Sequence, residues 1–187
     1  MKLKKLNAVT GLLSILCMLL HVGYSIYAYL TFYYNPLLTK AFSVPFMVSA
    51  CLHGILGMLT VFLQNDGGRM DLYPKQNRRT ILQRVSAALI FPLLIIHVNT
   101  FSAMRESAEK GHVTLIILLI LAELIFFSAV LTHIAVSLTN GFITLGVLSS
   151  RETQKKIDRV IYVIGALGFV IAVYAVVKVQ IAMFLTK

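Results

Sequence analysis

Five long apolar stretches dominate this sequence, and they restrict the fold more than any motif does. A helix that crosses the hydrocarbon core of a bilayer needs roughly 20 predominantly apolar residues. Because 58% of the 187 residues are hydrophobic and only 13% are charged, the chain is too apolar for a soluble globular domain. We therefore predict an all-α membrane protein, a five-helix transmembrane bundle that forms one domain over residues 1–187. The predicted spans are about 6–31, 41–64, 80–103, 113–138 and 160–184.

Turn and helix-breaking residues separate the stretches: Asn35-Pro36, then Asn65-Asp66-Gly67-Gly68 with Pro74, then Gly111 before the fourth span. We expect the fourth helix to continue beyond the membrane, through Asn140 and Gly141, to about Ser149. The first stretch resembles a signal peptide, but its apolar run is longer than a signal-peptide core and has no small-x-small cleavage site. It is therefore predicted to be a retained first span. Cys17 and Cys51 lie within spans, where we expect buried thiols and no disulfide.

The distribution of Lys and Arg predicts the orientation, because short cytoplasmic loops collect these residues. Twelve of the 17 fall on one side of the predicted membrane: Lys2, Lys4, Lys5, Arg69, Lys75, Arg78, Arg79, Arg84, Arg151, Lys155, Lys156 and Arg159. Four fall on the other side, and Lys178 lies within the last span. The N-terminus is thus predicted to be cytoplasmic and the C-terminus outside. The loops also account for the net charge of +10, so it does not indicate nucleic-acid binding.

Histidines are the chemical feature of the spans, because polar side chains are costly in hydrocarbon and need partners. His21, His53, His97 and His133 lie one each in the first four spans, and the fifth has none. A single such residue is more often a helix–helix hydrogen-bonding group than a ligand. Four neutral imidazoles with a single intramembrane acid beside them favour a metal, and haem iron is suited to an axial histidine pair.

Depth sorts the four histidines into two pairs. Counting 1.5 Å per residue, His21 and His97 lie ~22–26 Å from the inner edge of the membrane, in its outer half. His53 lies ~17 Å from that edge, and His133 lies near the inner end of its helix. We call His21 and His97 the outer pair, and His53 and His133 the inner pair. Two stacked bis-histidine b haems would occupy these pairs.

With five spans, a cytoplasmic N-terminus and histidines in the first four helices, the whole chain resembles the di-haem cytochrome b anchor subunit of succinate:menaquinone reductases and quinol:fumarate reductases, in the class with one large anchor subunit. The stretch QRVSAALIFPLLIIHV, residues 83–98, is similar to the Arg-x-Ser then His pattern of that superfamily through Arg84, Ser86 and His97. The resemblance implies the same haem pairing that depth predicts. Members often carry Gly then Arg after the last haem histidine; here Asn140-Gly141 has no following Arg before Arg151.

The resemblance also implies the partners and the path of electrons. An FAD flavoprotein subunit would handle succinate or fumarate, and an iron–sulfur subunit would pass electrons to the inner haem. The outer haem would exchange them with menaquinone, at a quinone site on this chain. The chain would lie in a bacterial cytoplasmic membrane without itself reacting with succinate or fumarate. It has no Gly-rich nucleotide loop and no cysteine cluster of its own. The basic segments 65–84 and 149–159 have two open interpretations. They are either the surface on which the partner subunits dock, or only the positive charge that orients the chain in the membrane.

Other residues are also candidates for the site, but the sequence supports them less strongly than the four histidines. Glu123, the one carboxylate within a span, is predicted to take a quinone-linked proton, the alternative being a packing role. Asn99, Thr100 and Ser102 are expected near the quinone pocket. Arg84, with Ser86, is a candidate to bind a haem propionate, and interfacial snorkelling of the arginine is the alternative.

Two other functions stay open at this stage. The first is a cytochrome b anchor for another membrane dehydrogenase, such as a hydrogenase or formate dehydrogenase, which would share the haems. The second is a small transporter that uses histidines for protons or metal ions, which predicts no haem and more polar residues along a path. The direction of the reaction and the type of quinone are not predicted.

Overall fold

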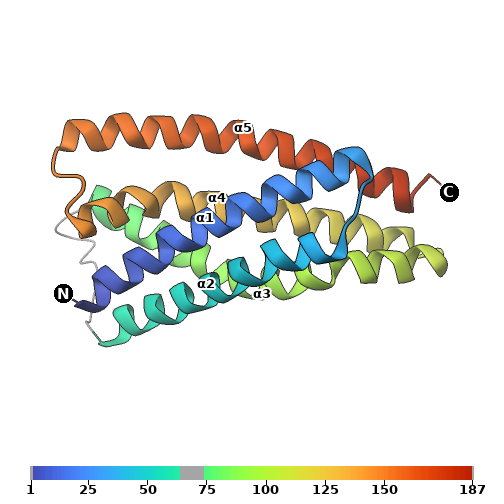
Figure 1. Ribbon diagram of the computed structural model, residues 1–187, viewed down its shortest axis with the longest axis horizontal. Helices are drawn as coiled ribbons and strands as arrows, with labels where there is room; N and C mark the ends of the chain where they lie inside the picture. Colours follow the sequence, from blue (N-terminus) through green and yellow to red (C-terminus); the bar gives the residue numbers. More distant parts are fainter. Residues whose placement is uncertain (1, 64–73, 187) are drawn as a thin grey trace.

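A computed structural model describes residues 2–63 and 74–186, and these form five helices with no strand among them (Figure 1). Their bounds are α1 Lys2–Thr31, α2 Pro36–Leu63, α3 Pro74–Glu109, α4 Val113–Leu145 and α5 Arg151–Phe184. All five are long and apolar enough to cross a membrane, so the predicted all-α, multi-pass architecture is confirmed. The helices run along one common axis, and the two termini lie at opposite ends of the bundle (Figure 1).

The helices pack as two hairpins and a fifth helix. α1 packs closely with α2, and α3 with α4, while α4 also contacts α1 and α5. Among the described residues, the main backbone neighbour of α2 is α1. Side chains therefore mediate the contact of α2 with α3 and α4. One example is Phe91 on α3, which packs against Gly54 on α2.

Specific caps place the helix ends. Asn35 Oδ1 accepts the backbone N–H of Leu37 at 2.9 Å, and Pro36 occupies the first helical position of α2. The Tyr24 hydroxyl accepts the Asn35 N–H at 2.9 Å and so ties this turn to α1. Gly111 ends α3 with φ +70°, and Gly146 ends α4 with φ +78°; a residue with a Cβ rarely adopts this conformation.

Polar residues make up an unusual share of the interior. Ten apolar and nine polar or charged side chains are buried among the described residues, whereas most large apolar side chains face outward. This pattern is typical of helices in lipid, where small and hydroxyl residues mediate helix packing. The apolar cluster Met104, Ile116 and Ile120 lies near the α3–α4 turn.

The helices extend beyond most of the predicted spans, because a helix continues after its apolar run has left the membrane. α5 begins at Arg151 and α3 ends at Glu109, each several residues outside the predicted span. α4 continues through Asn140 and Gly141 as predicted, but it ends at Leu145 rather than Ser149 because Gly146 caps it. The predicted turn Asn65-Asp66-Gly67-Gly68 and the basic residue Arg69 lie outside the described residues.

Candidate cofactor site

The inner pair, His53 on α2 and His133 on α4, lies towards the end of the bundle that holds the N-terminus. The centroids of the two imidazole rings are 6.1 Å apart, with the ring planes 62° from parallel. Two nitrogen–metal bonds of ~2.0 Å, with the rings beyond them, would place the centroids ~6 Å apart. The separation of the two rings would allow both imidazoles to bind one metal ion.

Gly11 on α1 forms one wall of this site. A Cβ built on Gly11 would lie 2.9 Å from Cε1 and 3.0 Å from Nδ1 of His53, closer than side chains approach one another. The His53 ring therefore occupies the space that the missing side chain leaves. Both histidines are partly buried in the interior, so residues from α1, α2 and α4 build the inner site together.

The outer pair, His21 on α1 and His97 on α3, lies further from the N-terminal end of the bundle than the inner pair. Each ring is held by an aromatic neighbour. Phe46 stacks on His21 with centroids 5.5 Å apart, and Phe126 stacks on His97 at 4.7 Å. Stacking fixes the plane of each imidazole, as an axial ligand requires.

In all four histidines Nδ1 faces a hydrogen-bond acceptor. Nδ1 of His53 lies 3.1 Å from the Asn7 carbonyl oxygen, and Nδ1 of His133 lies 3.1 Å from that of Gln83. A carbonyl can only accept, so these Nδ1 atoms carry the hydrogen.

In the outer pair, Nδ1 also faces a hydrogen-bond acceptor. Nδ1 of His21 lies 3.1 Å from Ser43 Oγ, whose own hydrogen is donated to the Thr39 carbonyl oxygen at 2.6 Å. Nδ1 of His97 lies 2.8 Å from Oε2 of Glu123. Among the described residues no hydrogen bond involves Nε2 of any of the four, so this nitrogen is available to bind a metal in each ring. Metal-binding histidines share this arrangement, with the second nitrogen held by an acceptor.

Four imidazoles from four different helices, each with Nδ1 at an acceptor, make up a donor set of the kind that would hold haem iron. Among the described residues there is no group of three or more His, Cys, Asp or Glu side chains that could hold a bare metal ion.

The other predicted site residues lie at varied distances from the histidines. Ser86 is 3% exposed and its hydroxyl lies 3.3 Å from His133 Nδ1, so it contacts the imidazole itself. Arg84 is half-buried near the same end of α3, and its role at a propionate stays a prediction. Thr100 is buried beyond His97, whereas Asn99 and Ser102 lie on the exposed face of α3. Cys17 and Cys51 are free thiols, and both are half-buried rather than buried as predicted.

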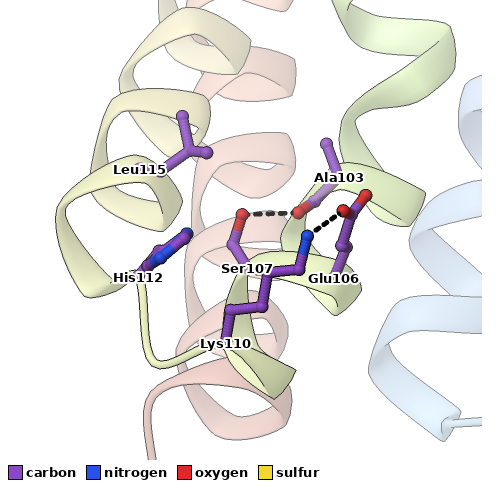
Figure 2. Close-up of a pocket in the computed structure, with 6 residues that line it drawn as sticks. All are labelled: Ala103, Glu106, Ser107, Lys110, His112 and Leu115. Atoms are coloured by element: carbon purple, nitrogen blue, oxygen red, sulfur yellow. Dashed lines mark hydrogen bonds and ion pairs between the residues drawn. The ribbon is translucent and has the colours of Figure 1, made fainter.

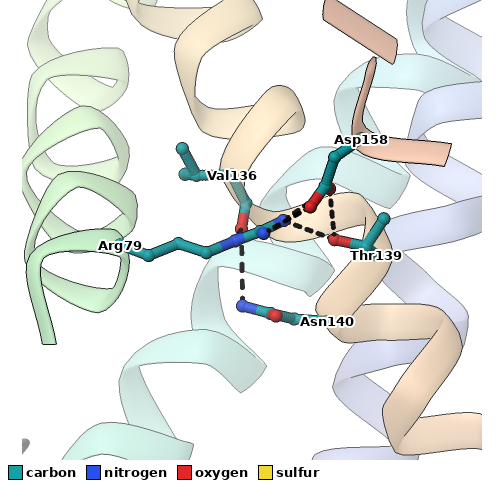
Figure 3. A network of polar contacts seen from close by, with 5 residues as sticks. All are labelled: Arg79, Val136, Thr139, Asn140 and Asp158. Carbon is teal, nitrogen blue, oxygen red and sulfur yellow. Dashed lines mark hydrogen bonds and ion pairs between the residues drawn. The ribbon is translucent and has the colours of Figure 1, made fainter. Parts of the chain in front are cut away.

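Sequence patterns did not reveal a polar network towards the end of the bundle that holds the N-terminus (Figure 3). The Arg79 guanidinium binds both carboxylate oxygens of Asp158, at 2.9 and 3.0 Å, and its Nε donates to the Val136 carbonyl oxygen at 2.7 Å. It also donates to Thr139, whose hydroxyl donates to Asp158 at 2.8 Å. The network joins α3, α4 and α5 one helical turn from His133. The sequence gives no signal for it, because Arg79 and Asp158 are 79 positions apart.

A pocket of about 240 Å³ lies at the other end of α3, beside the turn to α4 (Figure 2). It is lined by Ala103, Glu106, Ser107, Lys110, His112 and Leu115. Its charges neutralise one another, since Lys110 Nζ lies 2.5 Å from Glu106 Oε1, and this hydrogen bond raises the pKa of Lys110. The pocket does not contain any of the four paired histidines.

Comparisons with protein-family models, with curated proteins and with solved structures found no match for this chain.

Proposed function

We propose that this chain is the membrane-anchor cytochrome b subunit of a succinate:quinone oxidoreductase, that is, of a succinate dehydrogenase or fumarate reductase. It would carry electrons between an iron–sulfur subunit and menaquinone through two b haems. One observation supports this most strongly: four helices each contribute a histidine whose Nδ1 is held by an acceptor and whose Nε2 is free. Hydrogen-bonded imidazoles of this kind are preorganised as ligands, and a transporter path does not require such uniformity.

Each part of the chain has a role in this proposal. The inner pair, supported by Gly11 and by the carbonyls of Asn7 and Gln83, would hold the haem nearer the iron–sulfur subunit. The outer pair would hold the haem nearer the quinone. When bound, the haems supply one-electron redox centres, with potentials that depend on the ligands and on the groups around them. Glu123 remains the proposed acceptor of a quinone-linked proton, and its Oε1 has no hydrogen-bond partner among the described residues.

The orientation and the partners belong to the same proposal. The basic residues of the N-terminus, of the start of α3 and of the start of α5 gather at one end of the bundle, which would face the bacterial cytoplasm. A flavoprotein with covalent FAD and an iron–sulfur subunit would dock there.

Ligand substitutions test the assignment. Purified chains with His53→Leu or His21→Leu are each expected to lose one b haem and keep the other, because each pair holds its own iron. The matched control is His112→Leu, which changes an exposed histidine of the pocket and should keep both haems. Loss of haem in the control alone, or full retention in both ligand variants, would overturn the proposal.

A further inference from the structure

The four histidines differ in the chemistry of the atom that accepts the Nδ1 hydrogen. A neutral oxygen serves His21, His53 and His133: the hydroxyl of Ser43 or a backbone carbonyl, each at 3.1 Å. Only His97 faces a carboxylate, and its distance of 2.8 Å is the shortest of the four. Carboxylates are stronger acceptors than carbonyls or hydroxyls, and their bonds are shorter for that reason.

The buried position of Glu123 strengthens its electrostatic interaction with His97. The residue is 3% exposed, so little water screens its interaction with His97. Phe126, one helical turn further along α4, stacks on the same imidazole at 4.7 Å and holds the ring against the carboxylate. The contact therefore joins α3 to α4 in one defined geometry.

We propose that Glu123 is a positioning residue that sets the redox potential of the outer haem through His97. A carboxylate that accepts the Nδ1 hydrogen raises the electron donation of the imidazole to iron. Stronger donation stabilises the oxidised metal more than the reduced metal, so the reduction potential falls. This inference rests on the proposed function, and it describes the ionised Glu123 carboxylate before it takes a quinone-linked proton.

A redox titration of the purified chain tests this inference. The titration is monitored by absorption spectra, and the sample contains no quinone. The outer haem is identified as the one that His21→Leu loses. In Glu123→Gln, which keeps the size of the side chain and removes its charge, the reduced-to-oxidised ratio of the outer haem at a fixed potential should rise about tenfold. For a one-electron couple this is a shift of about 59 mV to a higher potential. The inner haem should not shift.

The matched control is Glu106→Gln, the same substitution at a carboxylate that is 66% exposed at the outer end of α3. It should leave both potentials unchanged. An unshifted outer haem in Glu123→Gln, or equal shifts in both haems or in both variants, would overturn the inference. If Glu123→Gln does not retain both haems, Glu123→Asp takes its place, since its shorter side chain breaks the contact and should raise the outer potential too. A wild-type chain without haem would instead refute the proposed function itself.

Discussion

The site depends on where individual imidazole nitrogens point. A histidine in hydrocarbon must find a partner, and a single hydrogen-bond acceptor satisfies only one of its two nitrogens. Here the acceptors engage Nδ1 in every case, including carbonyl oxygens of Asn7 and Gln83. The sequence indicated which residues are candidate ligands, because it showed one histidine in each of four spans. It did not indicate these acceptors, because any residue provides a backbone carbonyl.

Gly11 provides a test at the residue scale. In Gly11→Ala the new Cβ would lie 2.9 Å from His53, so the imidazole must shift and its affinity for the inner haem should fall. We expect a loss of roughly 10- to 100-fold in affinity, as for other residues that support a metal ligand. The measurement is haem content per chain by the pyridine haemochrome spectrum, which should fall from two towards one.

Gly23 is the matched control on the same helix. A Cβ on Gly23 would meet no atom within 4 Å, so Gly23→Ala should keep both haems. Equal haem content in the two variants would show that Gly11 does not support the inner site.

At the scale of the helices, the ion pair between Arg79 and Asp158 fixes how α3, α4 and α5 meet. Side chains of the pair are 21% and 14% exposed. Arg79 lies one turn before Gln83, whose carbonyl oxygen accepts the Nδ1 hydrogen of His133, so the register of α3 against α4 also sets the position of the His133 ring. Arg is suited to this role, because its planar guanidinium binds a carboxylate at two points and still has a donor for a carbonyl.

Breaking this pair should destabilise the bundle. In Asp158→Asn the Arg79 charge loses its partner, which costs about 1–3 kcal/mol for a hydrogen bond to a charged group. We expect a lower Tm in detergent, measured by circular dichroism. Glu152→Gln is the control on the same helix, because its ion pair with Lys156 is 77% and 74% exposed and should contribute little. Equal Tm values for the two variants would rule out a structural role for the Arg79 network.

The elements themselves were largely predictable, and their ends were not. An apolar run long enough to span a membrane leaves helix as the structure that satisfies its backbone, so all five helices follow from hydropathy. The ends of the helices are set by two other features. One is a cap, such as Gly146 in its left-handed conformation; the other is the continuation of a helix into polar sequence beyond the apolar run, as at Arg151. The Arg79–Asp158 pair joins residues far apart in the chain, and no local pattern encodes it.

The whole molecule has its charges and its histidines arranged along one axis. Basic residues gather at the end that holds the N-terminus, the inner pair lies nearer that end, and the outer pair lies beyond it. Electrons entering at the basic end would reach the inner haem first and the outer haem second. The proposed order of electron transfer thus follows from two features: which end of the bundle carries the basic residues, and where each histidine pair lies along it.

Labelling from the two sides of the membrane tests the orientation. In a chain whose Cys17 and Cys51 are replaced by Ala, we expect Lys40→Cys to react with an impermeant maleimide in intact cells. We expect Lys155→Cys, at the other end of the bundle, to react only after the membrane is opened. The reverse pattern would invert the topology and place the inner pair on the outer side.

The most direct test of the account is a reduced-minus-oxidised absorption spectrum of the purified chain, with a count of haem per polypeptide. We predict the α-band and Soret shift of low-spin b haem, and two haems per chain. A chain that is folded and helical but free of haem would contradict the central claim, and the four histidines would then have to be assigned to a proton or metal path.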